Sequence, residues 1–193
     1  MTILATRPPA TGASFIHEDL GLSFVTAALR RDGVECRYHD GLQEGCSAGD
    51  YVTKLVEAEE SILCVTVHAE CWADEIFAML GRVKARAPQK VIIAGGHPVS
   101  MIDEAVFAAC PGSVDYLVRG DGERTIVDLV RAIGRGRDHA HVDEVAGISF
   151  IRDGSICRTP DPPSPPEKVT VGAPWASARR AAPAPPSVTL LWR

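Results

Sequence analysis

The chain has 193 residues, of which 46% are hydrophobic and 23% charged, and its formal net charge at pH 7 is −5. This length and apolar content support one ordinary domain with a substantial core. The mild negative charge argues against a nucleic-acid surface, which needs a basic patch. The apolar runs are far shorter than the ~20 residues that cross a bilayer, so neither nucleic acid nor a membrane is an expected partner.

The start of the chain and its cysteines indicate a compartment. The N-terminus lacks the charged start and apolar stretch of a signal peptide. The six cysteines are scattered, with no CxxC pair, which favours reduced thiols over a disulfide framework. We therefore expect a cytoplasmic protein.

The first part of the chain alternates short apolar runs with amphipathic segments. The run 2–6 ends at Arg7-Pro8-Pro9, and Asp19 can cap a helix that Gly33 ends. The run 61–67 is apolar almost throughout, which is typical of a strand buried on both faces. The pattern predicts strands at 2–6, 34–38 and 61–67, with helices between Asp19 and Gly33 and over 51–56.

The same alternation continues after residue 70. An apolar stripe with helical spacing runs through 125–134. Near the end of the pattern, Asp153-Gly154 separates two strand-like runs, which is a strong β-hairpin signal. The pattern predicts helices at 72–86, 100–110 and 125–134, strands at 91–94 and 114–118, and hairpin strands at 145–151 and 155–157.

Five alternating units of this kind predict a doubly wound α/β domain, flavodoxin-like or Rossmann-like, over residues 1–158. We expect a five-stranded parallel sheet in the order 2-1-3-4-5, with the C-terminal hairpin as an antiparallel edge. The proline-rich stretch 159–171 predicts an extended linker. Residues 172–193 are rich in alanine and proline and predict a disordered tail.

Two of the predicted strands end in glycines. The motif GGHP (95–98) follows the strand 91–94, and GDGE (120–123) follows the strand 114–118. Glycine lets a ligand approach the backbone without meeting a Cβ, and open parallel sheets bind ligands at the carboxyl ends of their strands. We therefore expect these loops to form the floor of a site for a large, partly apolar ligand.

Common nucleotide and signalling motifs are absent from the sequence. There is no GxGxxG after the first strand and no GxxxxGK[ST] anywhere. A phospho-acceptor receiver domain would need an acidic pair after the first strand and an aspartate ending the third, and neither is present. These absences disfavour a simple nucleotide or a phosphoryl group as the ligand.

The motifs GGHP, VDYLVRGDGERT (114–125) and GISF (147–150), in this order and spacing, resemble the N-terminal cobalamin-binding domain of B12-dependent radical SAM enzymes. The resemblance covers about residues 1–160. It implies a base-off cobalamin against the carboxyl edge of the sheet, with its nucleotide tail passing between strands and helices. The cofactor-binding residues that it implies are Thr66, His68, Glu70, Gly95, Gly96, His97, Pro98, Gly120, Asp121, Gly122 and Glu123.

The sequence departs from the better-known B12 motifs in two places. The nearest stretch to the DxHxxG motif is FIHEDLG (15–21). Phe15 stands where the motif has its aspartate, two residues before the histidine, and the glycine comes one residue late. We therefore do not assign His17 as a cobalt ligand and predict no metal-ligating residue. The CxxxCxxC motif of the radical SAM half is missing, so we expect no iron–sulfur cluster and a separate radical SAM protein as the partner.

Alternatives remain open at this stage. Asp121 and Glu123 suit a cap of the following helix as well as a ligand contact. The chain could be a stand-alone cobalamin-binding module, a small enzyme on the same fold with a different ligand, or a truncated remnant without cobalamin. We assign no catalytic residue, and the enzymatic alternative would draw its chemistry from His68, Glu70, Cys71 or His97.

Overall fold

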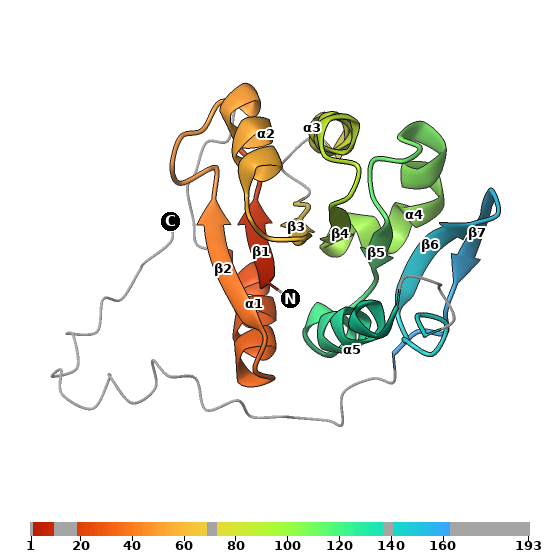
Figure 1. Cartoon of the computed structure of the whole chain (residues 1–193). Helices are drawn as coiled ribbons and strands as arrows, with labels where there is room; N and C mark the ends of the chain where they lie inside the picture. The colour runs from red at the N-terminus through yellow and green to blue at the C-terminus, as the bar shows by residue number, and fades with distance from the viewer. Residues whose placement is uncertain (1, 10–18, 69–72, 137–140, 163–193) are drawn as a thin grey trace, which may run out of the picture. The chain divides into compact units, whose positions relative to one another are not determined.

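The computed structural model describes residues 2–9, 19–68, 73–136 and 141–162, and every structural statement below refers to these residues. Within them, seven strands form one sheet in the order β2-β1-β3-β4-β5-β6-β7 (Figure 1). The strands are β1 (Thr2–Arg7), β2 (Glu35–Asp40), β3 (Ile62–Thr66), β4 (Val91–Gly95), β5 (Tyr116–Val118), β6 (Ile148–Arg152) and β7 (Ser155–Arg158). The helices are α1 (Leu20–Arg31), α2 (Ala48–Glu57), α3 (Ala73–Arg86), α4 (His97–Ala109) and α5 (Gly122–Arg135).

The pairing of the strands confirms the predicted doubly wound sheet. β1 to β5 are parallel in the order 2-1-3-4-5, and β6 and β7 add an antiparallel hairpin at the β5 edge, which brings the sheet to seven strands. Asp153 and Gly154 both have positive φ, 51° and 75°, the backbone that a tight two-residue hairpin requires.

Helices cover both faces of the sheet. Figure 1 shows α1 and α5 on one face and α2, α3 and α4 on the other. Along β3, Ile62 and Cys64 belong to the core beneath α1 and α5, whereas Leu63 and Val65 belong to the opposite core. A strand buried on both faces needs apolar residues at every position, which explains why the sequence of β3 shows no alternation.

Helix α4 begins three residues earlier than the predicted start at residue 100, at His97. Gly96 occupies the N-cap position with a φ of 126°, and Pro98 lies in the first turn. A helix leaves its first N–H groups without intrahelical partners, so proline is tolerated there. The GGHP motif is therefore the junction from β4 to α4 rather than a longer loop.

Strands β2 and β5 also differ from their predicted bounds. β2 continues to Asp40, which pairs with Arg7 at the end of β1. The side chains of Arg7 and Asp40 also form a buried ion pair. β5 begins only at Tyr116. Before it, the carboxylate of Asp115 accepts the N–H of Ile92 at 2.7 Å, and the N–H of Asp115 donates to the Ile92 carbonyl at 2.9 Å.

The predicted linker begins with residues that bond to the sheet. The N–H of Thr159 donates to the Ile148 carbonyl, and the carbonyl of Pro160 accepts from Gly147. The guanidinium of Arg119 donates to the Thr159 carbonyl and to Asp161. The boundary at 158 remains a prediction, and residues 163–193, with the predicted tail, lie outside the described part of the chain. None of the described helices has the length and apolar character to cross a membrane.

Candidate functional site

A pocket of about 380 Å³ lies at the carboxyl ends of β3, β4 and β5. Its strand walls include Cys64, Ile93 and Val118, which belong to the core beneath α1 and α5. The first turns of α1, α4 and α5 complete the wall. Eight of the eleven predicted cofactor-binding residues line the pocket, namely Thr66, Gly95, Gly96, His97, Gly120, Asp121, Gly122 and Glu123.

A glycine at the last position of β4 keeps part of the pocket clear of side-chain atoms. In the sheet register, Gly95 lies between Thr66 on β3 and Val118 on β5. A Cβ added to Gly95 would lie 3.6 Å from the Val118 Cβ, an ordinary contact. The backbone at Gly95 therefore accepts a side chain, and the missing side chain leaves open space.

Gly122 has a similar role at the start of α5. A Cβ there would lie 3.5 Å from Val25 Cγ2 and 3.6 Å from Val118 Cγ1. Both distances are ordinary van der Waals contacts, so larger side chains at Gly122 would extend along α1 and β5. The two glycines thus clear space on the same face of the sheet.

Gly96 has a different role, because the backbone itself requires glycine there. Its φ of 126° lies outside the range that other residues adopt readily. A Cβ at Gly96 would also lie 2.2 Å from the Val67 carbonyl oxygen. Gly96 lets the start of α4 pack directly against the end of β3, and this close approach sets the position of the pocket's wall.

Ser100 joins the two glycine loops. Its hydroxyl donates to the Gly96 carbonyl at 3.3 Å and accepts the N–H of Gly120 at 2.9 Å. Ser100 itself lines the pocket. This side chain holds the junctions after β4 and β5 together, although they are more than twenty residues apart in sequence.

A buried carboxylate lies beside the pocket at the start of α1. Asp19 accepts the N–H of Leu22 at 2.9 Å, which caps α1, and its second oxygen lies 2.8 Å from His68 Nε2. Burial raises the pKa of Asp19, but hydrogen bonds from His68 and Leu22 outweigh burial and hold the pKa below its usual value. His68 also lies 3.4 Å from the Thr66 hydroxyl, so the network orients a residue that lines the pocket.

The walls of the pocket are mainly apolar and uncharged, with two carboxylates, those of Asp121 and Glu123, at the start of α5. Burial raises the pKa of the Cys64 thiol, which therefore stays neutral. Asp121 occupies the N-cap position of α5, yet its side chain makes no capping hydrogen bond. The alternative that Asp121 acts as a helix cap therefore has no hydrogen bond to support it, and Glu123 lies in the first turn of α5.

The structure does not bring every predicted residue into the pocket. His68 forms a hydrogen bond with Asp19, and Pro98 lies in the first turn of α4. Neither residue lines the pocket. Glu70, Cys71 and His17 lie outside the described residues. The sequence prediction missed wall residues contributed by the helix starts. These are Gly21, Leu22, Val25, Ser100, Met101 and Ile126.

Comparison with known proteins identifies the family. Residues 8–130 match the family model described as the B12 binding domain. The chain belongs to the B12 binding domain family. This confirms the resemblance that the GGHP and RGDGE motifs indicated.

Related sequences include methyl-transferring proteins. The chain is 28% identical over 131 residues to a hopanoid C-3 methylase of Methylococcus capsulatus, covering 68% of this chain and 24% of that protein. It is 25% identical over 169 residues to an uncharacterised methyltransferase of Pyrococcus horikoshii, covering 84% of this chain and 35% of that protein. The chain thus spans about a quarter to a third of the length of these relatives.

Solved structures share the fold. The radical S-adenosylmethionine methyltransferase TsrM from Kitasatospora setae, with cobalamin and a [4Fe-4S] cluster bound, matches with a TM-score of 0.70 and 19% identity. That match covers 83% of this chain and 29% of TsrM. The cobalamin-dependent S-adenosylmethionine radical enzyme OxsB, with aqua-cobalamin and S-adenosylmethionine bound, matches with a TM-score of 0.69 and 18% identity over 83% of this chain and 22% of OxsB.

Proposed function

We propose that this B12 binding domain binds cobalamin and holds its nucleotide tail in the pocket between the sheet and helices α1 and α5. The observation that carries the proposal is the open space above Gly95, which an ordinary side chain would fill. The pocket's volume of about 380 Å³ lies within the ~300–1,000 Å³ of small-molecule sites. It suits a nucleotide tail rather than a whole corrinoid, whose ring would rest on the carboxyl edge of the sheet.

Different residues around the pocket would contact different parts of such a tail. Cys64, Ile93 and Val118 form an apolar floor for a flat aromatic base. The hydroxyls of Thr66 and Ser100 line the same space. The Thr66 hydroxyl can hydrogen-bond to polar groups of the tail, and the Ser100 hydroxyl, whose proton is donated to Gly96, can accept a hydrogen bond through its remaining lone pair. The glycine loops would let the tail approach the backbone closely. When bound, cobalamin supplies a cobalt centre for alkyl-transfer or radical chemistry.

We further propose that the cobalamin serves a radical SAM protein on a separate polypeptide. The 193 residues contain no CxxxCxxC spacing, whereas the TsrM structure holds both cobalamin and a [4Fe-4S] cluster. Mixing the cobalamin-loaded chain with the product of a neighbouring reading frame that contains CxxxCxxC should give a complex on gel filtration. Separate elution of the two proteins would contradict this part of the proposal.

Reconstitution tests the proposed cofactor directly. The purified chain is incubated with hydroxocobalamin, passed through a desalting column, and its visible spectrum is recorded. We expect about one equivalent of cobalamin to remain bound, with the spectrum of the base-off form, because the tail is held away from the cobalt. A colourless protein after desalting would contradict cobalamin binding.

A further inference from the structure

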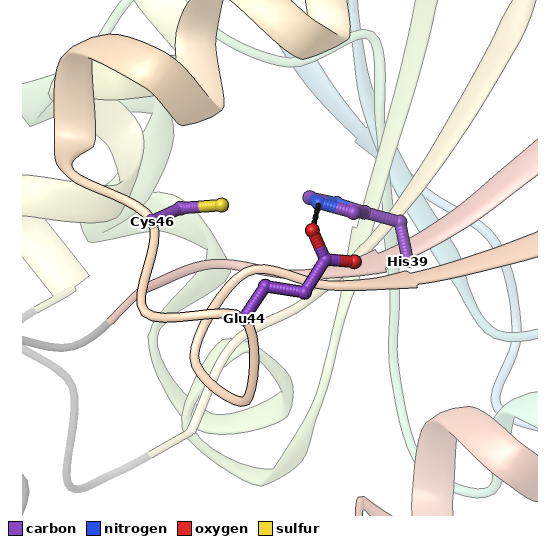
Figure 2. Close-up of side chains that lie close together, drawn as sticks. All are labelled: His39, Glu44 and Cys46. Carbon is purple, nitrogen blue, oxygen red and sulfur yellow. Dashed lines mark ion pairs between the residues drawn. The ribbon is translucent and has the colours of Figure 1, made fainter.

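Three metal-ligating side chains meet at the carboxyl end of β2, outside the cobalamin pocket. His39 lies on β2, and Glu44 and Cys46 lie in the turn that leads to α2. Figure 2 shows the imidazole, the carboxylate and the thiol pointing toward one another, and one ligand atom from each lies within 4.8 Å of the others. None of the three lines the pocket between α1 and α5.

The turn that carries two of these residues is held by its own backbone. The N–H of Glu44 donates to the Asp40 carbonyl at 3.0 Å, and the N–H of Cys46 donates to the Gly41 carbonyl at 2.9 Å. The Asp40 carboxylate also accepts the N–H of Gln43. Glu44 and Cys46 are therefore presented toward His39 by a fixed turn.

His39 has a buried nitrogen without a hydrogen bond. The side chain is only 9% exposed, and Nε2 makes no hydrogen bond although Glu44 Oε2 lies 3.4 Å away. The other nitrogen, Nδ1, lies 3.0 Å from the Thr6 hydroxyl, which in turn lies 3.1 Å from the Tyr51 hydroxyl. With the proton on Nδ1 donated to Thr6, the lone pair of Nε2 faces Glu44 and Cys46.

This arrangement has the features of a metal-binding histidine. Such residues usually bond through the second ring nitrogen to a group that fixes the orientation of the ring, and here Thr6 fills that place. Tyr51 stacks on the ring with a centroid distance of 5.7 Å. The contact with Thr6 on one side and the stacking of Tyr51 therefore fix the orientation of the ring.

We propose that His39, Glu44 and Cys46 form a binding site for a divalent transition metal of the zinc type. Imidazole, thiolate and carboxylate are the ligands that Zn²⁺ takes, at about 2.0–2.3 Å in a tetrahedron. Ligand atoms of such a tetrahedron lie roughly 3.3–3.8 Å apart, so the observed spread of up to 4.8 Å requires only side-chain rotation. Glu44 is 47% exposed, which leaves a fourth position for water or a substrate atom.

Lys54 competes with a metal at this site. Its ammonium lies 2.5 Å from Glu44 Oε2 and so occupies the side of the carboxylate that a cation would need. The side chain is 49% exposed and can turn into solvent when a cation replaces it. Removing the ammonium should therefore strengthen metal binding, an effect that a purely structural ion pair would not produce.

Zinc titration of the purified full chain, without cobalamin and after chelator treatment, tests the site. We expect about one equivalent of Zn²⁺ to bind in competition with a chromogenic chelator. Cys46→Ser and Glu44→Gln should each weaken binding at least tenfold, and Lys54→Met should strengthen it. Cys157→Ser is the matched control, since Cys157 is another partly exposed free cysteine, and it should bind zinc as the wild type does.

Co²⁺ provides a second readout that depends on the thiol. Co²⁺ bound at the site should give a near-ultraviolet thiolate charge-transfer band that Cys46→Ser abolishes and Cys157→Ser retains. If circular dichroism shows that Cys46→Ser does not fold, the zinc affinity of Lys54→Met and the Co²⁺ band of the wild type test the proposal instead. No stoichiometric zinc, or equal zinc affinity in the wild type and folded Cys46→Ser, would overturn the proposal.

Discussion

The carboxyl edge of this sheet is open at one place and filled at another. At the ends of β3, β4 and β5, Gly95 leaves space beneath α1 and α5. At the ends of β1 and β2, side chains fill the corresponding space. They are the buried ion pair of Arg7 and Asp40, at 2.7 Å, and the stacked rings of His39 and Tyr51. Topology alone marks the whole edge as a binding region, but the side chain at each strand's last position determines where a ligand fits.

The largest expected effect concerns the backbone at the open end. Gly96→Ala should destabilise the fold by at least about 3 kcal/mol, because it combines an unfavourable φ with an overlap on Val67. Gly154→Ala is the matched control, because it has a positive φ of 75° in open space, and it should cost about 1 kcal/mol. Denaturant unfolding measures both, and equal costs would show that the close approach at Gly96 is unimportant.

The filled end depends on a buried ion pair. Arg7→Met leaves the carboxylate of Asp40 without its guanidinium and should cost about 3 kcal/mol of folding free energy. The double change Arg7→Met with Asp40→Asn should recover most of this loss, because no unpaired charge then remains and the amide oxygen can still accept the N–H of Gln43. Cobalamin uptake by the folded fraction should not change, and a specific loss of uptake would contradict the separation of the two ends.

A smaller effect is expected at the start of α1. Asp19→Ala removes the cap and the contact with His68 and should cost about 1 kcal/mol at pH 7. The folded pKa of Asp19 lies below the usual 3.8, so its contribution is present above pH 3.8 and is lost as the pH falls through the folded value. Unfolding curves of wild type and variant should therefore converge in acid, whereas the exposed change Asp74→Ala should cost little at any pH.

The sheet could be predicted from local patterns. Continuous apolar runs marked the buried parallel strands, and Asp153-Gly154 marked the hairpin. The pocket loops were found because the glycines of 95–96 and 120–122 directly follow such runs. These signals involve neighbouring residues, so the sequence displays them without knowledge of the fold.

Features that join distant residues could not be predicted. The Arg7–Asp40 pair, which extends β2, links positions 33 residues apart. Ser100 joins two loops through hydrogen bonds that no spacing rule reveals. The site at His39 combines a strand residue with a turn, and its histidine was recognisable only once burial of its Nε2 was known.

Cobalamin uptake by Gly95→Leu tests the central claim most directly. The backbone at Gly95 accepts a side chain and the neighbouring contacts are ordinary, so the variant should fold with a stability within about 1 kcal/mol of the wild type. The leucine should fill the pocket and weaken cobalamin retention at least tenfold, whereas the exposed helix control Gly49→Leu should retain cobalamin as the wild type does. Normal retention by a folded Gly95→Leu variant would contradict the placement of the nucleotide tail in this pocket.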